Sequence, residues 1–278
     1  MTEKNSKGCK VRKLRLGKVP GLLRCYNQRT NLKGDVKTCT ILRKDIGTHY
    51  EYYACISYEP LPEKRKEGKK GLVGVDIGIS NIAALSDGTV FPGEYAYLQK
   101  EEELRKTQRK LSTLSRFTDG YRKTKAVLNH VYEKIDNRRR NTTEKISRYI
   151  VDRYDIIAME DLSVAQLRRI AMDRRMLKRY NDVKLGELRR RIQDKAGSAG
   201  CSIIFVDPRG TSQICSGCGS YVKKDLSVRT HVCPVCGYVC DRDVNGARNI
   251  YARALSQMPQ GSAGDPRPGF VRAEKPAV

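Results

Sequence analysis

The sequence lacks any apolar run near the eighteen or so residues that a membrane-spanning helix needs. Its first residues, Met1 to Lys18, are polar and lack the apolar core of a secretory signal peptide. Acidic residues are scarce, because 31 Asp and Glu stand against 55 Lys and Arg, a net charge of +24 over 278 residues. These absences argue against a membrane or secreted protein and predict a cytoplasmic one.

The positive charge is spread over the whole length and is not gathered in one tail. Such an extended basic surface predicts a polyanionic partner. Acidic lipid is the weaker alternative, because no basic amphipathic helix stands beside an anchoring signal. The 15 Tyr and 4 Phe could stack on bases, although most tyrosines in strands are expected only to pack.

Four of the ten cysteines form two Cys-x-x-Cys pairs, separated by fourteen residues (219 to 232). This spacing predicts one tetrahedral zinc ion on two tight turns. The predicted ligands are Cys215, Cys218, Cys233 and Cys236. Two disulfides or ordinary buried cysteines are the alternative, and a lysine-rich chain without a secretory leader disfavours them. We therefore predict a closed, structural zinc ribbon.

A helix is expected after the ribbon, over residues 241–256. It carries an apolar stripe at helical spacing, made of Ala247, Ile250 (or Tyr251) and Ala254. Asp243 lies on that stripe, whereas Asp241 points about 200° away from it and suits a capping role. A core-facing acid is costly unless it is paired or bound to a metal. The pattern alone leaves open a salt bridge to an arginine or a metal site.

The first sixty residues contain strand-like runs. They cover residues 11–16, 36–42 and 51–58, with a bend at Gly47 between the last two. Basic side chains alternate through these runs, so a small sheet could present a positive face to a phosphate backbone. Solvated lysines on a packing sheet fit the same pattern. Residues 60–70 are charged and irregular and are expected to form a linker.

A second core is predicted from residue 71 onward. Three runs, 71–77, 81–86 and 89–91, with turns at Gly78 and Asp87-Gly88, indicate an antiparallel meander. Two long helices follow, and an apolar stripe that includes Val127, Val131 and Ile135 marks the second. Residues 155–159 and 202–206 then indicate buried strands, with a helical region over 168–196 between them.

The outer faces of the two long helices are basic. A solvated face is the usual meaning of such charge, but the excess of basic over acidic residues between Lys106 and Arg140 favours nucleic acid. The candidate nucleic-acid contacts are Arg105, Lys106, Arg109, Lys110, Arg122, Lys123, Lys125, Arg138, Arg139 and Arg140.

Three acids are expected to meet at one edge of the sheet. Asp76 and Glu160 end two strands that should run together, and the closing helix could bring Asp243 to the same edge. Three converging carboxylates repel one another. Two divalent cations about 3.5–4 Å apart would relieve that repulsion and clamp a phosphoryl group in displacement. Magnesium is the expected ion, since it needs only a few carboxylates plus water and phosphate oxygens.

Several segments together resemble the transposon-encoded TnpB proteins, RuvC-type nucleases of insertion sequences that are related to the type V CRISPR effectors. The segments are Gly74-Val-Asp76-Ile-Gly78, Ser86-Asp-Gly88, Met159-Glu160-Asp-Leu162, Thr211-Ser-Gln-Ile-Cys215-Ser-Gly-Cys218-Gly, Cys233-Pro-Val-Cys236-Gly and Asp241-Arg-Asp243-Val-Asn245. The likeness extends over about residues 10 to 255.

The resemblance implies an α/β protein with an RNase H-like (RuvC) nuclease core, an inserted zinc ribbon and a small N-terminal β-barrel-like domain. It implies Asp76, Glu160 and Asp243 as catalytic, magnesium-binding acids. It also implies a guide RNA, a DNA target beside a short transposon-associated motif, and a prokaryotic cytoplasm or nucleoid. Family members usually carry a helical recognition segment in or before the barrel, and residues 10–60 leave no space for one.

We therefore expect five segments. They are a wedge-like β-rich domain and linker (1–68), the nuclease core with its basic helical hairpin (69–210), the zinc ribbon (211–240), the closing helix (241–256) and a disordered tail (257–278).

The predicted function is that of a metal-dependent, RNA-guided DNA endonuclease encoded by a transposon. One alternative is a transposon-derived repressor that binds nucleic acid without cutting it. Three clustered acids argue against it, because a pure binder gains nothing from like charge. Another is a structure-specific nuclease that uses the same acids without a guide.

Overall fold

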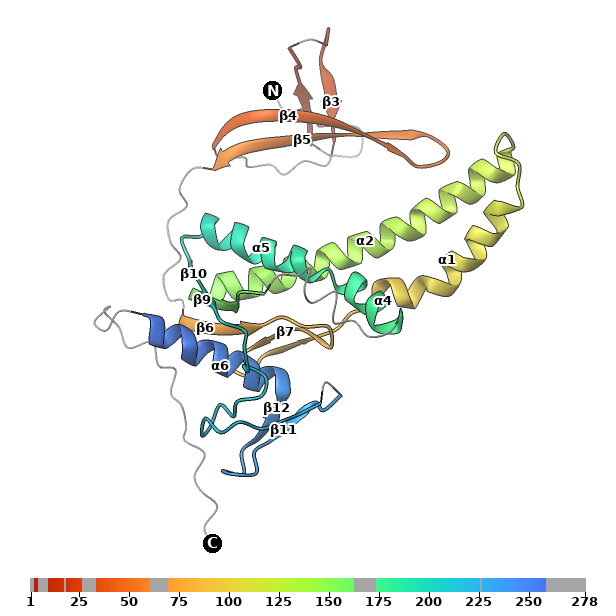
Figure 1. The fold of residues 1–278 in the computed structure, drawn as a ribbon. Coiled ribbons are helices and arrows are strands. Elements are labelled where there is room, and N and C mark those ends of the chain that lie inside the picture. Colours follow the sequence, from red (N-terminus) through yellow and green to blue (C-terminus); the bar gives the residue numbers. More distant parts are fainter. Residues whose placement is uncertain are drawn as a thin grey trace. The chain divides into compact units, whose positions relative to one another are not determined.

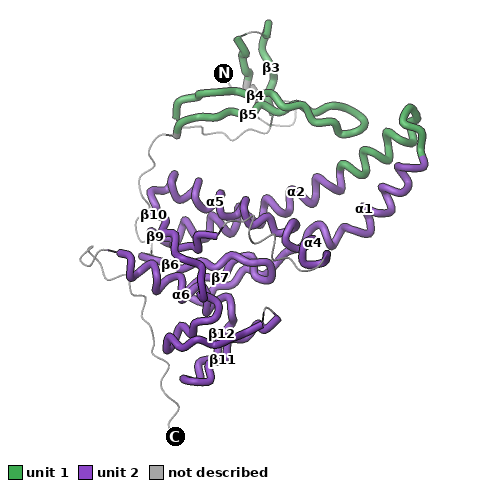
Figure 2. The backbone as a smooth tube through the Cα atoms, in the orientation of Figure 1, with its two compact units in different colours: residues 1–63, 114–129 green, residues 64–113, 130–278 purple. Residues whose placement is uncertain are grey.

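The computed structural model describes residues 3–4, 10–17, 19–26, 34–60, 70–162, 174–225 and 227–258. It divides into two compact units: Met1–Glu63 with Leu114–Asn129, and Lys64–Thr113 with His130–Val278 (Figure 2). The predicted linker between Pro60 and Lys70 and the predicted disordered tail beyond Met258 lie outside the described residues.

The larger unit is built on a five-stranded mixed sheet with the order β10-β9-β6-β7-β8 (Figure 1). Its strands are β6 (Lys70–Asp76), β7 (Asn81–Leu85), β8 (Val90–Pro92), β9 (Tyr154–Glu160) and β10 (Ser202–Val206). Strands β6, β9 and β10 are parallel, and β7 and β8 return antiparallel. The predicted meander and the predicted parallel central strands are both confirmed.

Helices cover both faces of this sheet (Figure 1). The described helices are α1 (Ala96–Ser112), α2 (Asp119–Arg153), α4 (Arg174–Val183), α5 (Leu185–Ser198) and α6 (Arg242–Gln257). Residues of α2, α4 and α5 pack on one face of the sheet and residues of α6 on the other, whereas α1 contacts α4. Successive side chains of a strand face opposite sides. Val73 and Val75 therefore pack with residues of α2 and α5, whereas Leu72 packs with Ile250 and Tyr251 of α6. Burying each such apolar side chain stabilises the fold by about 1.5–3 kcal/mol.

Two helical predictions need correction. The single helical region expected over residues 168–196 is two helices where the structure describes it, because Lys184 adopts a left-handed conformation (φ 51°) between α4 and α5. Val127, expected in the apolar stripe of the second long helix, is 54% exposed, whereas Val131 and Ile135 are buried as expected. Periodicity predicts which face of a helix carries a residue, but it does not predict how far along that face other elements pack against the helix.

A buried ion pair links three helices of the larger unit. Asp182, 1% exposed, accepts hydrogen bonds from the backbone N–H groups of Tyr97 (2.9 Å) and Leu98 (3.1 Å) at the start of α1. The Arg139 guanidinium on α2 lies 2.7 Å from the same carboxylate. Removing one partner of such a pair leaves an uncompensated buried charge, at a cost of about 3–5 kcal/mol. Arg139 is therefore a structural residue of this helix junction.

The smaller unit holds a three-stranded sheet, a long hairpin and residues 114–129. The strands are β1 (Glu3–Lys4), β2 (Lys10–Leu14), β3 (Leu23–Cys25), β4 (Gly34–Asp45) and β5 (Tyr50–Pro60). The hairpin β4-β5 confirms the two predicted strands and the bend at Gly47. Next to the bend, Asp45 pairs with Lys125 of α2 (2.6 Å). Within the described strands the two sheets share no pairing, so the predicted barrel is not closed by them.

Membrane insertion of a helix finds no support in the described part of the chain, where no helix is both long and apolar enough to span a bilayer.

Candidate metal sites at the sheet edge and the zinc ribbon

The four predicted zinc ligands lie together. Their sulfur atoms are all within 4.8 Å of one another, with Cys215 and Cys236 3.7 Å apart and Cys218 and Cys233 3.6 Å apart. Zinc–sulfur bonds of about 2.3 Å in a tetrahedron place sulfurs about 3.8 Å apart, whereas a disulfide would bring them to about 2.05 Å. The cluster therefore fits a structural zinc ion, and the disulfide alternative is excluded for these pairs.

The backbone around the cysteines is that of two tight turns. Gly219 N–H donates to Cys215 O (2.8 Å), and Gly237 N–H donates to Cys233 O (3.0 Å). Both glycines have positive φ, 78° and 71°, which a residue with a side chain adopts only with strain. The second turn joins β11 (Thr230–Val232) to β12 (Val239–Asp241). Cys240 lies in β12, outside the cluster.

The thiols differ in their surroundings. Burial raises the pKa of Cys215, whereas the hydroxyl and backbone of Ser220 lower the pKa of Cys218 to about 6. A thiol that ionises readily is a good metal ligand, because the thiolate is the form that binds.

Asp76 and Glu160 face the same side of the sheet. The β6–β9 register pairs Val75 with Met159, so the next residues, Asp76 and Glu160, lie side by side at the ends of two parallel strands. Gly74 and Asp76 alternate with Val75 and therefore point to the face that α6 covers. Both carboxylates are half-buried.

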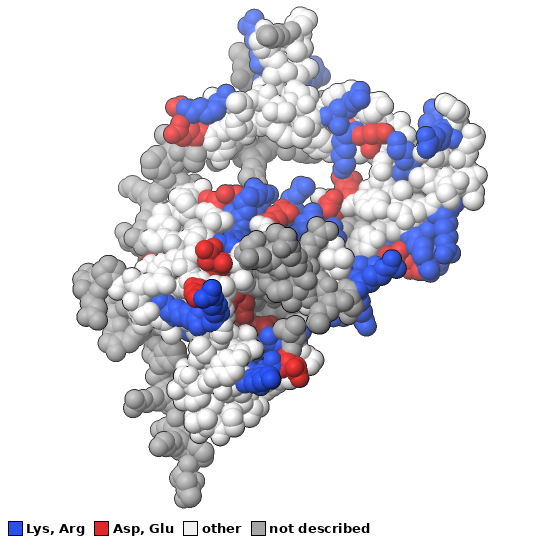
Figure 3. Space-filling model, in the orientation of Figure 1, with Lys and Arg blue, Asp and Glu red and all other residues white. Residues whose placement is uncertain are grey.

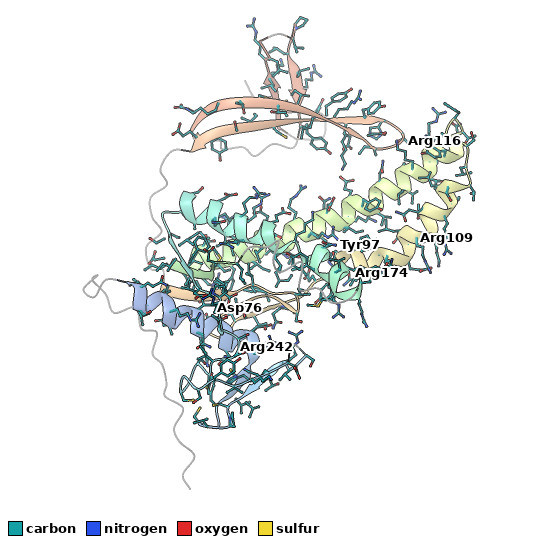
Figure 4. All side chains as sticks on the ribbon, viewed as in Figure 1. Asp76, Tyr97, Arg109, Arg116, Arg174 and Arg242 are labelled. Carbon is teal, nitrogen blue, oxygen red and sulfur yellow. The ribbon has the colours of Figure 1, made fainter. Side chains whose placement is uncertain are left out.

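Two glycines allow α6 to lie directly on this face. A Cβ atom at Gly74 would come within 2.0 Å of the Ala247 carbonyl oxygen, and one at Gly246 within 2.6 Å of Asp76 Oδ2. A larger residue at Gly74 would meet the backbone of α6 and push the helix away from the strand, whereas one at Gly246 would displace the Asp76 carboxylate. The first turns of α6, which begins at Arg242, consequently lie close to Asp76 (Figure 4).

The two aspartates at the start of α6 have different partners. Asp241 caps the helix, since its Oδ1 accepts hydrogen bonds from the backbone N–H groups of Asp243 (2.8 Å) and Val244 (3.2 Å). The predicted capping role of Asp241 is confirmed. Asp243 Oδ2 accepts a hydrogen bond from Asn81 Nδ2 (2.8 Å), and no arginine forms an ion pair with Asp243 among the described residues.

The three carboxylates influence one another. Burial, then the charges of Glu160 and Asp243, raise the pKa of Asp76 well above its ordinary value. Burial also raises the pKa of Glu160 and of Asp243, and hydrogen bonds from Thr211 and Asn81, respectively, oppose that rise. The site therefore concentrates negative charge that a bound cation would stabilise.

Asp76 has the strongest need for such a cation. In the described part of the chain, no group donates a hydrogen bond to its carboxylate. The cysteines are the one set among the described residues that brings three or more ligand atoms within 4.8 Å of one another, so the acids are spread more widely than that.

One face of α6 holds the start of the zinc ribbon. Asn245 accepts a hydrogen bond from Ser216 N–H (2.9 Å) and donates to Ile214 O (2.7 Å). Asn249 donates to the carbonyls of Thr211 and Ile214, both at 2.7 Å. Further along, Arg253 donates to the carbonyls of Asp207 and Arg209. We call Asn245, Asn249 and Arg253 the polar ladder of α6.

The polar ladder is not among the predicted functional residues. Its signal is a spacing of four residues, which places polar side chains on one helix face beside the apolar stripe. Because the ladder contacts the segment between β10 and the first cysteine pair, it connects the zinc ribbon to the helix that carries Asp243.

Six of the ten basic candidates for nucleic-acid contact form ion pairs. They are Arg105 and Lys106 with Glu102, Arg122 with Asp119, Lys125 with Asp45, Arg138 with Glu94, and Arg139 with Asp182. The other four, Arg109, Lys110, Lys123 and Arg140, are exposed and have no ion-pair partner within the described ranges. Figure 3 shows basic side chains gathered along α1. Ion pairs at the surface contribute little stability, so five of the six paired residues could exchange their acidic partner for a phosphate. Arg139 could not, because its partner Asp182 is buried.

The fold and the clusters define an α/β protein with acidic strand ends and a four-cysteine ribbon before its last helix. Two family models match the chain: "Probable transposase" (OrfB_IS605) over residues 54–171 and "Cas12f1-like, TNB domain" over residues 186–250. The chain belongs to the TnpB family of transposon proteins, which is related to the Cas12f type V effectors.

Individual relatives support the same family. "Putative RNA-guided DNA endonuclease InsQ" of Escherichia coli (strain K12) is 30% identical over 245 residues, 84% of this chain and 60% of the relative. Cas12f1 of Sulfoacidibacillus thermotolerans, described as a CRISPR-associated endodeoxyribonuclease, is 31% identical over 72% of this chain and 50% of the relative. The chain thus spans between half and three-fifths of the length of these relatives. A solved structure described as a CRISPR-Cas12f ternary complex aligns with a TM-score of 0.48 and 18% identity, over 73% of this chain and 42% of that chain.

Proposed function

We propose that the protein is a metal-dependent DNA endonuclease in which Asp76, Glu160 and Asp243 hold magnesium. One observation carries this proposal. Asp76 is half-buried, lacks a hydrogen-bond donor among the described residues, and lies between two further carboxylates that raise its pKa. Such a carboxylate is costly to the fold unless a cation binds it. A repressor that acts only by occupying its target would gain nothing from a carboxylate that destabilises the fold.

The arrangement of the larger unit supports an RNase H-like (RuvC) core. Parallel strands β6 and β9 lie at the centre of the sheet, and two antiparallel strands extend it on one side. The acids at the ends of β6 and β9 occupy the edge at which α/β proteins bind their ligands. We assign residues 69–210, the ribbon over 211–240 and the helix over 241–256 to this nuclease, and residues 1–68 to a wedge-like domain.

The three acids would bind metal, and exposed basic residues would bind the nucleic acid. Asp76 lies next to Glu160 and beneath the first turns of α6, and it would hold magnesium together with Asp243. Glu160 would complete the site and help to orient the attacking water. Bound magnesium would supply the charge that stabilises the attacking and leaving oxygens. Exposed basic residues such as Arg109 and Lys110 would bind phosphates at a distance from the reacting bond.

We further propose that the cleavage is guided by RNA and directed at DNA. The support is the family membership, the names of InsQ and Cas12f1, and the net charge of +24, which two nucleic-acid strands would neutralise. If a guide is absent, the same acids would serve a structure-specific nuclease. RNA that co-purifies with the full chain separates these cases, and sequencing that RNA supplies the matched target.

The nuclease proposal is tested by nicking of a matched plasmid with the co-purified RNA and Mg²⁺. Asp76→Ala, Glu160→Ala and Asp243→Asn should abolish nicking and leave nucleic-acid affinity within a few-fold of the wild type, because binding rests on distant basic residues. Asp241→Asn is the matched control, since it removes the same charge two residues away and asparagine is also a good helix cap. If Asp243→Asn nicks DNA and Asp241→Asn does not, Asp241 and not Asp243 is the aspartate of the site. A wild type that binds tightly and never nicks would favour the repressor.

A further inference from the structure

Thr211 is a buried polar residue in contact with a site carboxylate. Its side chain is 4% exposed, and its hydroxyl Oγ1 donates to Glu160 Oε1. The same Oγ1 lies 3.0 Å from the carbonyl oxygen of Pro208. An ionised carboxylate is a stronger acceptor than a neutral carbonyl, with hydrogen bonds roughly twice as strong. The hydroxyl hydrogen therefore belongs to Glu160 whenever that residue is charged.

The backbone of Thr211 is held from two sides. Asn249 of the polar ladder donates to Thr211 O (2.7 Å), and Thr211 N–H donates to Pro208 O (3.4 Å). Arg253 holds the turn just before it through the carbonyl of Arg209 (2.7 Å). The position of the hydroxyl is consequently set by α6, the helix that also carries Asp243. Thr211 thus connects the strand of one acid to the helix of another.

The hydrogen bond restricts a side chain that is otherwise free to turn. The terminal torsion of glutamate is broad, so an unrestrained carboxylate rotates with little cost. In the described part of the chain, no other group donates a hydrogen bond to the Glu160 carboxylate and no cation forms an ion pair with it. Among the described residues, the Thr211 hydroxyl is the one hydrogen-bond donor that restricts this rotation, and it engages Oε1 while leaving Oε2 without a hydrogen bond. Arg253 acts on Glu160 only through its charge.

We propose that Thr211 is a positioning residue of the acid site. By holding Oε1, it orients Glu160 so that Oε2 joins Asp76 and Asp243 in binding divalent cations. This proposal rests on the proposed function, in which those acids bind metal. Groups that hold metal ligands in place typically contribute roughly 10–100-fold to metal affinity.

Manganese binding tests the proposal without relying on cleavage. Mn²⁺ is titrated into the full chain, freed of nucleic acid, and followed by electron paramagnetic resonance. Mn²⁺ binding that is present in the wild type and absent from Asp76→Asn is assigned to the acid site. Thr211→Val keeps the shape of the side chain but loses the hydroxyl, and we expect it to weaken Mn²⁺ binding roughly 10–100-fold. Thr211→Ser restores the hydroxyl and should bind nearly as tightly as the wild type, with zinc content unchanged in both.

Thr143→Val is the matched control, because Thr143 is equally buried (4% exposed) on α2, outside the acid site. Three results would overturn the positioning role: Mn²⁺ affinity unchanged in Thr211→Val, an equal loss in Thr143→Val, or loss of zinc from Thr211→Val. Failure of the nuclease proposal is distinguishable, since a wild type that binds Mn²⁺ at the acids but does not nick DNA leaves the Thr211 comparison intact. If the wild type nicks DNA and Thr211→Val binds Mn²⁺ and nicks DNA equally well, only the proposed role of Thr211 is contradicted.

Discussion

Among the single residues, Asp76 has the least support from the rest of the chain. Its raised pKa has a direct consequence for stability without bound divalent cation. Below the unfolded-state pKa of about 3.8 the carboxyl is protonated in both states, and stability is unaffected. As pH rises from there toward the higher folded-state pKa, the unfolded chain releases this proton while the folded protein, with a half-buried group beside two other acids, retains it. Stability relative to a neutral side chain falls over this pH range, and the loss is complete once the pH exceeds the folded-state pKa.

We therefore expect Asp76→Asn to unfold at a higher temperature than the wild type at pH 8 without Mg²⁺. The difference should shrink as pH falls toward 4, and Mg²⁺ at pH 8 should stabilise the wild type alone. Thermal unfolding of both proteins at each pH measures this. Asp194→Asn, at an exposed position on α5, should show no such pH-dependent difference. A wild type more stable than Asp76→Asn at pH 8 without Mg²⁺ would contradict the raised pKa.

The sequence predicted the acids but not the side chains that hold them. Asp76, Glu160 and the different roles of Asp241 and Asp243 follow from strand alternation and from helix geometry, which are local. Asn81 meets Asp243 across 162 residues, and Thr211 meets Glu160 across 51. Such contacts arise from the packing of distant segments, and no periodicity marks them.

At the level of elements, α6 connects the zinc ribbon to the acid site. Structural zinc in small ribbons contributes about 10–16 kcal/mol of apparent binding energy at pH 7, which appears as folding. Loss of one ligand should release the metal and loosen the first cysteine turn. The polar ladder would then lose its partners at Ile214 and Ser216, and α6 would lose part of its support.

We expect Cys215→Ser to lose the near-stoichiometric zinc measured by elemental analysis in the wild type. Amides in the first turns of α6 should exchange faster with solvent, whereas those of β6 and β9 should stay protected. Cys240→Ser is the matched control within the same ribbon, because Cys240 lies outside the cluster. Full zinc retention in Cys215→Ser, or unchanged protection of α6 after zinc is lost, would disprove the coupling.

Secondary structure was the part most open to prediction. The parallel strands, the meander, the helical hairpin and the closing helix all have strong local patterns, and the structure contains each of them. The break at Lys184 has no such signal, because the residue with positive φ is a lysine and not the glycine that usually marks such a position. The N-terminal barrel was inferred from resemblance, and strand patterns do not predict whether a sheet closes.

At the level of the whole molecule, positive charge should dominate nucleic-acid binding. Each neutralised phosphate lowers the slope of log affinity against log salt by about 0.9 for duplex DNA. Arg109 and Lys110 are exposed on α1 and, within the described residues, carry no ion pair. Replacing both with Gln should therefore make the slope shallower by up to about 1.8 if both contact phosphate.

Filter binding at several salt concentrations measures that slope. Arg148→Gln combined with Arg190→Gln is the control, since both are exposed helix arginines paired with an aspartate four residues later. If the control variant changes the slope as much as the α1 variant does, total charge determines the slope and α1 is not a binding surface.

The proposed nuclease activity depends on joint binding of divalent metal by Asp76, Glu160 and Asp243. A crystal structure with Mn²⁺, located by its anomalous scattering, would show such binding. We expect manganese at the edge of the sheet where β6 and β9 end, with Asp76 among the ligands and Asp243, not Asp241, contributed by α6. Two ions should lie about 3.5–4 Å apart when a nucleic-acid phosphate is also bound. No anomalous peak at the three acids, or a peak coordinated by Asp241 in place of Asp243, would disprove this metal site.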